Sequence, residues 1–196
     1  MPDVQWFLLV AIAYTLGSVS TGYYLVKFRT GQDIRLLGSG STGARNVGRT
    51  LGTLGFAATL AGDAAKGALA VGAATIYGLD ERGLIVVTVA VFAGHVWPVH
   101  LQFRGGKGLS PVMGAVLVLD YWVVIVTLLV AAIALAATKR FTPSGLLAVA
   151  LAPVLAAATG RSSADVVIGL SALVALIFLA HRQNIVSAFE RPESRQ

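Results

Sequence analysis

Phosphate-binding chemistry is indicated by residues 31–49, which read GQDIRLLGSGSTGARNVGR. The glycines Gly38, Gly40 and Gly43 let successive backbone N–H groups approach an anion without obstruction by a Cβ atom. Side chains that can add hydrogen bonds or positive charge are Ser39, Ser41, Thr42, Arg45, Asn46 and Arg49. The lysine and the spacing of a Walker loop are absent, so this segment alone supports a phosphate site and a flexible loop whose cations only fix membrane topology about equally.

A second cationic segment, residues 94–108, reads GHVWPVHLQFRGGKG. Arg104 and Lys107 are separated by Gly105 and Gly106 where one apolar stretch has ended and the next begins. Two cations and two glycines at a helix N-terminus predict a second anion site. The alternative is again a loop whose cations only set topology, but two such segments on one face are harder to explain in that way.

Two charges, Asp63 and Lys66, lie inside an otherwise apolar helical stretch. Residues three apart share a helix face, where an ion pair would limit the cost of placing charge in lipid. A charge inside a membrane segment suggests function by default. We favour a structural pair that locks helix packing, with Gly62 and Gly67 allowing the helices to approach closely.

The three histidines, His95, His100 and His181, fall near the cytoplasmic ends of the expected helices. No acidic residues accompany them at metal-ligand spacing, so no metal site is expected. His181 begins the segment HRQNI, in which Asn184 either contacts a substrate hydroxyl or phosphate group or caps the final helix.

Composition indicates one membrane-embedded domain over residues 1–196, since 56% of the residues are hydrophobic and 12% are charged. The N-terminus lacks the basic region of a signal peptide, so the first apolar stretch is expected to remain as a span. The net charge is +6, but no basic helix outside the apolar stretches suggests binding to nucleic acid. With no cysteine, the chain has no disulfide, thiolate metal site or cysteinyl acyl intermediate.

The elements that must position these residues are apolar stretches at 4–26, 51–79, 83–101, 109–138, 144–159 and 164–180. Most are close to the length of about 20 residues that a transmembrane helix needs. The stretch 109–138 is ambiguous, because it forms either one long helix or a hairpin that turns at residues 120–122. Each arm of that hairpin would have only about 15 residues, or about 22 Å of helix, and would have to be tilted or shielded.

The placement of cations favours the hairpin and therefore seven transmembrane helices, with the N-terminus outside and the C-terminus in the cytoplasm. With seven spans, 12 cations lie on one side against 2 on the other, Arg82 and Arg161, with Lys66 inside the membrane. With a single helix at 109–138 the split becomes 8 against 6. The rule that cations concentrate on the cytoplasmic side therefore predicts an all-α protein with seven spans.

Together these segments resemble the bacterial glycerol-3-phosphate acyltransferases that use acyl phosphate, a family of seven-helix integral membrane enzymes. The resemblance extends from Tyr14 to the tail. Its motifs are GSVSTGYYLVK, DIRLLGSGSTGARNVGRTLG, GDAAKGALAV, GHVWPV with FRGGKG, and HRQNI with Glu193 beyond.

The resemblance implies transfer of an acyl group from acyl phosphate to the first hydroxyl of glycerol 3-phosphate in the bacterial inner membrane, without a metal or cofactor. Lysophosphatidic acid and phosphate would be the products, and the enzyme that forms acyl phosphate is a candidate partner. The residues implied to be catalytic are Lys107, Arg49 and Ser39. From the resemblance and the cationic segments together, we expect the substrate-binding residues to be Gly38, Gly40, Ser41, Gly43, Arg45, Asn46, Arg104, Gly105, Gly106, His181 and Asn184. Of these, Gly38, Gly40, Gly43, Asn46 and Asn184 fall on the family pattern.

The chain also departs from the family pattern. Asparagine is usual where Ser41 stands and threonine where Arg45 stands. Serine is expected near Pro143, arginine at Ser187 and glycine at Arg191. A divergent paralogue without activity is therefore one alternative. The others are a small transporter with an ion path at the intramembrane charges and a structural membrane partner. Because the polar residues gather at one face and no repeat is evident, the enzyme is favoured.

Overall fold

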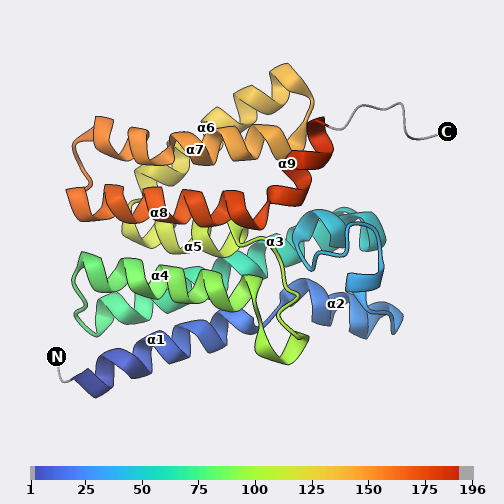
Figure 1. Ribbon diagram of the computed structural model, residues 1–196, viewed down its shortest axis with the longest axis horizontal. Helices are drawn as coiled ribbons and strands as arrows, with labels where there is room; N and C mark the ends of the chain where they lie inside the picture. Colours follow the sequence, from blue (N-terminus) through green and yellow to red (C-terminus); the bar gives the residue numbers. More distant parts are fainter. Residues whose placement is uncertain (1–2, 190–196) are drawn as a thin grey trace. The chain divides into compact units, whose positions relative to one another are not determined.

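The computed structural model describes residues 3–189, and every regular element in this range is a helix. The prediction of an all-α fold is confirmed for this part of the chain. Two compact units are present, Met1–Val124 and Ile125–Gln196. In chain order the helices, drawn in Figure 1, are α1 Asp3–Ser18, α2 Thr21–Thr30, η1 Ile34–Leu36, α3 Ala44–Ile76, α4 Glu81–Val96, η2 Val99–Leu101, α5 Leu109–Leu119, α6 Tyr121–Thr138, α7 Phe141–Thr159, α8 Ala164–Ala180 and α9 Arg182–Phe189.

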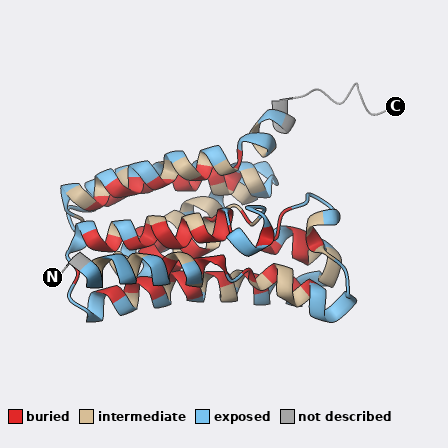
Figure 2. Cartoon of the chain, turned by 60° about the horizontal axis from the view of Figure 1, so that its bottom comes forward, coloured by how far each residue is buried: buried red, intermediate tan, exposed pale blue. Residues whose placement is uncertain are grey.

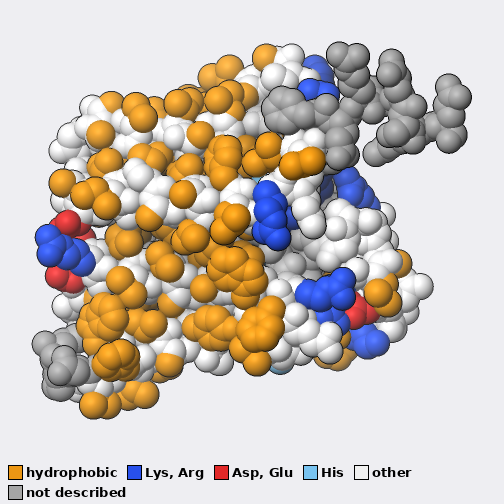
Figure 3. Space-filling view, viewed as in Figure 1, with side chains coloured by type: hydrophobic (Ala, Val, Ile, Leu, Met, Phe, Trp, Pro, Cys, Tyr) orange, Lys and Arg blue, Asp and Glu red, His pale blue; other side chains and the backbone are white. Residues whose placement is uncertain are grey.

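Among the described residues, five helical stretches are long and apolar enough to cross a membrane: Val4–Thr30, Ala44–Ile76, Glu81–Leu101, Tyr121–Thr138 and Phe141–Thr159. Leu109–Leu119 and Ala164–Ala180 are shorter apolar helices. Hydrophobic side chains are concentrated in the left and central parts of the face shown in Figure 3, as expected of side chains in contact with lipid, whereas Lys and Arg side chains form separate patches.

Residues 109–138 form two helices, as the hairpin model requires. Helix α5 ends at Leu119 and α6 begins at Tyr121. Between them, the Asp120 carboxylate accepts hydrogen bonds from the backbone N–H groups of Trp122 (3.0 Å) and Val123 (3.3 Å). An aspartate that satisfies the free N–H groups of a first turn is a helix N-cap. The expected interruption at residues 120–122 is therefore confirmed.

Two expected boundaries were wrong. The stretch 4–26 is not one continuous helix, because α1 ends at Ser18 and α2 begins at Thr21. Residues 31–49 are not all loop, because α3 begins at Ala44 and has a break at Gly52, where φ is +74°. Glycine adopts a positive φ at little cost, so the sequence allows a kink there that hydropathy alone does not show.

Small residues bring the helices of the first unit into close contact. Gly17 of α1 lies against the backbone of Val91 in α4, and Gly94 of α4 lies against the backbone of Tyr14 in α1. A β-carbon at either glycine would collide with a carbonyl oxygen on the other helix. Such approach of backbones through small residues is typical of helices packed within membranes.

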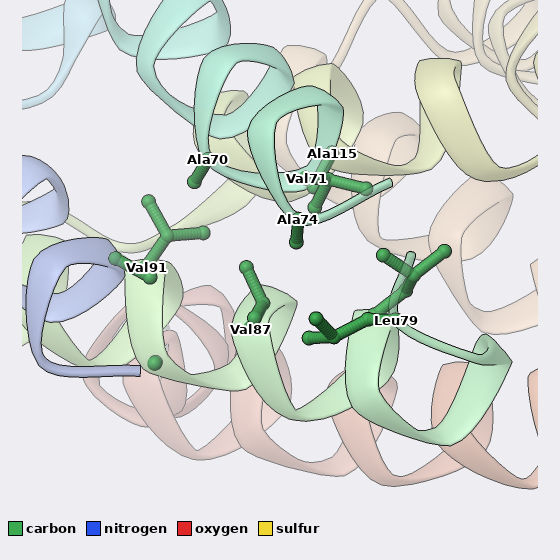
Figure 4. Packing of buried hydrophobic residues seen from close by; sticks show 10 residues of the cluster. Ala70, Val71, Ala74, Leu79, Val87, Val91 and Ala115 are labelled. Atoms are coloured by element: carbon green, nitrogen blue, oxygen red, sulfur yellow. The ribbon is translucent and has the colours of Figure 1, made fainter. Parts of the chain in front are cut away.

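Around these crossings lies an apolar core, shown in Figure 4, to which α3, α4 and α5 contribute. Its members include Val71 and Ala74 of α3, Val87 and Val91 of α4 and Ala115 of α5, all almost fully buried. Buried residues follow the facing sides of neighbouring helices, while the outward sides are more exposed (Figure 2). This packing fixes the helix ends from which the polar loops of the first unit project.

In the second unit, α7 packs against α8. The turn before α7 is held by Ser144, whose hydroxyl donates to the carbonyl of Arg140 (2.8 Å) and lies 2.9 Å from the hydroxyl of Thr138. Pro143, near which the family pattern is expected to have a serine, is exposed in the first turn of α7 and directly precedes Ser144. Proline is tolerated in a first turn because few N–H groups there have helical partners.

Candidate active site

Asn46 organises the first glycine-rich loop, residues 38–43. Its side chain is buried, and its oxygen accepts a hydrogen bond from the backbone N–H of Ser39 (3.0 Å). Its Nδ2 donates to the carbonyls of Leu37 and Ser41, both at 2.9 Å, and lies 3.3 Å from the carbonyl of Ile34. A buried amide with its hydrogen-bonding groups used by the backbone fixes the shape of a loop. Asn46 thus fixes the backbone conformation of this loop from its buried side.

The glycine at position 38 is required by this arrangement. Its φ is +55°, and a β-carbon there would collide with the Asn46 side-chain oxygen. Next in the loop, the Ser41 hydroxyl accepts from the backbone N–H of Gly43 (3.2 Å). An asparagine at this position can close the same kind of turn, so the departure at Ser41 preserves the local geometry. Thr42 is fully buried, which contradicts the expectation that its hydroxyl is available to a ligand.

The second loop, residues 97–108, folds back over the end of α4. Gly105 donates its N–H to the carbonyl of Val96 (3.1 Å), and Gly106 donates to that of His95 (3.0 Å). Gly108 has a φ of +82° and is the N-cap residue of α5. Lys107 is therefore held between a segment bound to α4 and the first turn of α5, whose free N–H groups carry partial positive charge.

Three observations bring the two loops together within the first unit. The guanidinium of Arg35 donates to the carbonyl of Leu101 (2.7 Å), and the backbone N–H of Thr42 lies 3.5 Å from the carbonyl of Gly105. The positive charge of Arg45 also lowers the pKa of Lys107, so a cation of the first segment acts electrostatically on the second. The expectation that both cationic segments lie at one end of the molecule is confirmed for this unit (Figure 1).

Arg35 itself is fixed by its neighbours. Its Nη2 lies 2.6 Å from Oδ2 of Asp33, and its guanidinium carbon lies 5.2 Å from the centre of the Tyr23 ring. The hydrogen bond from Arg35 lowers the pKa of Asp33. The pair is only partly exposed, so its geometry is better defined than that of a free surface ion pair. Arg35 therefore connects the first cationic segment to the carbonyl of Leu101 in the second loop. The sequence did not predict this role.

Lys107 is half-buried, and burial is the main reason that its pKa lies below the ordinary lysine value, with Arg45 adding to the shift. Two cations that interact electrostatically in a partly dehydrated site favour a bound anion, because the anion would stabilise both charges. Among the residues expected to contact substrate, Ser39, Arg45, Arg49 and Arg104 of the same unit are exposed. The backbone N–H groups of Ser39, Gly40, Gly43, Gly105 and Gly106 already donate within the protein, which contradicts the expectation that these loop N–H groups are available to an anion. Side chains and the N–H groups of the first turn of α5 are the groups that could bind a phosphate here.

His181 and Asn184 belong to the second compact unit. His181 is buried and is the C-cap residue of α8, and its Nδ1 donates to the carbonyl of Ile177 (2.9 Å). Asn184 lies inside α9, so the alternative that it caps α8 is wrong. Ser187 also lies within α9, whereas Arg191 and Glu193 lie outside the described residues.

A cluster that sequence reasoning found only in part lies inside the first unit. The predicted ion pair is confirmed, with Lys66 Nζ 3.0 Å from Asp63 Oδ1. His95 joins it, with its Nδ1 2.8 Å from Lys66 Nζ. Asp63 and Lys66 also provide hydrogen-bond partners for free backbone groups at the junction of α1 and α2. Lys66 donates to the carbonyl of Val19 (2.8 Å), and the N–H of Thr21 lies 3.4 Å from Asp63 Oδ1. The sequence could have indicated the role of His95, because polar side chains in apolar helices need hydrogen-bond partners within the protein.

Comparison with known proteins gives a consistent result. A family model described as glycerol-3-phosphate acyltransferase matches residues 7–191. Glycerol-3-phosphate acyltransferase 1 of Desulfitobacterium hafniense (strain Y51) is 45% identical over 184 residues, which cover 94% of this chain and 91% of that relative. The glycerol-3-phosphate acyltransferase of Clostridioides difficile (strain 630) is 36% identical over 191 residues, covering 94% of this chain and 92% of that relative.

Solved structures are similar as well. The crystal structure of PlsY, an integral membrane glycerol 3-phosphate acyltransferase, in its glycerol 3-phosphate form matches with a TM-score of 0.87 at 30% identity, covering 94% of this chain and 92% of that chain. The lysophosphatidic acid form of the same enzyme matches with a TM-score of 0.84 at 28% identity, covering 94% and 91%.

Proposed function

Because this chain belongs to the glycerol-3-phosphate acyltransferase family, we propose that it transfers a fatty acyl group from acyl phosphate to the first hydroxyl of glycerol 3-phosphate. The products are lysophosphatidic acid and inorganic phosphate, so the protein acts in phospholipid biosynthesis. The observation that carries the proposal is the pairing of two glycine-rich cationic loops around the half-buried Lys107, whose pKa the charge of Arg45 lowers. Both substrates carry a phosphate, which is the group that this arrangement suits.

Within this proposal, Lys107 and Arg49 neutralise phosphate charge and Ser39 donates its exposed hydroxyl to a phosphate oxygen. Asn46 acts through the loop that it holds. The remaining groups proposed to bind substrate are Gly38, Gly40, Ser41, Gly43, Arg45, Arg104, Gly105, Gly106, His181 and Asn184.

The donor is already activated, so positioning and charge stabilisation account for most of the catalysis. The glycerol 3-phosphate hydroxyl oxygen attacks the acyl carbonyl carbon, and a new ester C–O bond forms. The bond between that carbon and the phosphate oxygen breaks, and its electron pair leaves with phosphate. The departing phosphate takes the hydroxyl proton, so no side-chain base is needed. Positive charge at Lys107 and Arg49 stabilises the phosphate as it leaves.

The five long apolar helical stretches and the two shorter apolar helices support a seven-span topology, which we propose has the N-terminus outside and the C-terminus in the cytoplasm. We place the protein in the bacterial inner membrane with both loops at the cytoplasmic face, where an acyl-phosphate-forming enzyme would deliver the donor. The family match spans residues 7–191 and so includes both compact units, which supports one functional domain over residues 1–196.

The test uses purified protein in detergent or vesicles with glycerol 3-phosphate and palmitoyl phosphate. We expect lysophosphatidic acid and phosphate to form in equal amounts, and a chelator to leave the rate unchanged. Palmitoyl-CoA is the matched alternative donor. No histidine here has an aspartate five places later, as the acid/base pattern of acyl-CoA-dependent glycerolipid acyltransferases would require. Robust turnover with palmitoyl-CoA and none with palmitoyl phosphate would overturn the proposal.

A further inference from the structure

His95 connects the charged cluster inside the first unit to the loop that carries Lys107. Its side chain is buried on α4, and Asp63 and Lys66 are buried on α3. The ring nitrogen Nδ1 lies 2.8 Å from Lys66 Nζ and 3.7 Å from Asp63 Oδ1. These three side chains form one hydrogen-bonded group with little access to solvent.

The hydrogen-bond geometry around Lys66 fixes the proton on His95. The ammonium of Lys66 has three hydrogens, and three acceptors lie around Nζ: the carbonyl of Val19 at 2.8 Å, Oδ1 of Asp63 at 3.0 Å and Nδ1 of His95 at 2.8 Å. With Lys66 in its charged form, which has no lone pair, Nδ1 is the acceptor of this contact. A neutral imidazole that accepts at Nδ1 carries its hydrogen on Nε2.

The Nε2 edge of the ring lies against Gly106. A β-carbon on Gly106 would collide with Nε2 and lie 2.7 Å from Cε1 and 2.9 Å from Cδ2 of the ring. Gly106 also donates its backbone N–H to the carbonyl of His95 (3.0 Å). Backbone and side chain of His95 thus hold the residue that directly precedes Lys107.

We propose that His95 is a positioning residue for Lys107: held by Lys66 and Asp63 with its proton on Nε2, its ring supports Gly106 and so sets the place of the Lys107 ammonium. This inference rests on the proposed function, in which Lys107 binds the phosphate. It gives the intramembrane ion pair a role in the reaction, and it explains glycine at position 106 by the space that the ring occupies.

A double-mutant cycle tests the proposal. His95→Asn keeps an acceptor for Lys66 but removes the group that contacts Gly106. We expect His95→Asn to lower kcat/KM at least about tenfold in the otherwise wild-type enzyme, and less than about twofold in the Lys107→Ala background. Such coupling arises if His95 acts through Lys107. General damage to the fold would instead lower kcat/KM by the same factor in both backgrounds.

Thr88→Val is the matched control, because Thr88 is a buried polar residue on the same helix whose hydroxyl bonds locally to the carbonyl of Leu84. It should change kcat/KM less than about twofold in both backgrounds. An equal loss from His95→Asn with and without Lys107, or a loss below about twofold in the wild-type background, overturns the positioning role.

Thermal unfolding in detergent gives a second measurement that does not depend on activity. Gly106→Ala should lower the unfolding temperature in the wild-type background and lower it clearly less alongside His95→Asn, because the ring that its β-carbon strikes is gone. The same loss in both backgrounds contradicts the contact. A wild-type enzyme that does not use palmitoyl phosphate refutes the proposed function instead, and the unfolding cycle still tests the contact between His95 and Gly106.

Discussion

At the scale of single residues, the proposed site combines exposed groups, to which we assign contact with the substrate, with buried groups that hold the loops. Arg49 and Ser39 are exposed, Lys107 is half-buried, and Asn46 is almost fully buried. This difference separates direct contact from support. Asn46 uses its hydrogen-bonding groups on the backbone of its own loop, so its substitution is expected to act by deforming that loop.

Lys107 is the residue on which activity should depend most. Lys107→Ala removes a charge-assisted contact in a partly dehydrated site, so we expect a loss of about 3 kcal/mol, or about a hundredfold in rate. Lys107→Arg should also lower the rate substantially, because the planar guanidinium group of arginine does not replace a compact ammonium between two glycines. Initial rates at matched expression and membrane insertion measure both effects. Retention of more than about a third of the wild-type rate by Lys107→Ala, less than about 1 kcal/mol, would contradict this placement of the phosphate site.

The pH dependence of activity should report the environment of Lys107. Lysine is charged below its pKa, and burial together with Arg45 lowers the pKa of Lys107. Activity that requires the charge is therefore lost, as pH rises, at a lower pH than an ordinary lysine would give. Arg45→Gln removes the smaller of the two causes, so the alkaline fall in kcat/KM should move to higher pH.

Arg29→Gln is the control for this shift, because Arg29 is exposed on α2 and does not contribute to the pKa shift of Lys107. The fall at high pH should stay in place for this variant. A profile for Arg45→Gln that coincides with that of wild type would show that Lys107 does not control the alkaline side.

At the scale of helices, close backbone contact holds α3 and α5 in place. A β-carbon on Gly67 would collide with the carbonyl oxygen of Pro111, and one on Gly114 would collide with that of Ala64. Lys107 directly precedes the N-cap of α5, so this packing also positions the loop. The stability of the α3–α5 contact is therefore linked to the geometry of the site.

Gly67→Ala should destabilise the protein by about 1–3 kcal/mol, because the backbones must separate to admit the new methyl group. Gly72→Ala is the matched control on the same helix, where a β-carbon meets no atom within 4 Å. It should leave stability unchanged or raise it, since alanine favours a helix over glycine. Unfolding temperature in detergent compares the two. Equal temperatures for both variants would show that the contact contributes nothing.

At the scale of the whole molecule, the seven-span topology that we propose would place the polar loops on one side of the membrane. The chain has no cysteine, so single cysteines can be introduced and labelled from outside with an impermeant reagent. Gln32, Glu81 and Lys139 are exposed positions suited to such labelling. In intact cells we expect Glu81→Cys to react and Gln32→Cys and Lys139→Cys to react only after the membrane is opened. Labelling of Gln32→Cys or Lys139→Cys from outside contradicts the seven-span orientation.

The sequence determined the helical class, the break at Asp120 and the Asp63–Lys66 pair, because hydropathy, capping chemistry and helix periodicity are local properties of the chain. It also indicated both cationic glycine-rich loops. It did not predict the break between α1 and α2, because every side chain there is compatible with a helix and the free backbone groups are satisfied by residues more than 40 positions away.

Only the tertiary structure decided which polar residues act together. Sequence treated His95 as an isolated histidine, Asn46 as a substrate ligand and Arg35 as one cation among many. Their contacts with Lys66, with the loop backbone and with the carbonyl of Leu101 arise from the packing of separate helices. Spacing along the chain carries no information about such contacts, since helix packing brings together residues that are distant in sequence and does so through close approach at a few glycines.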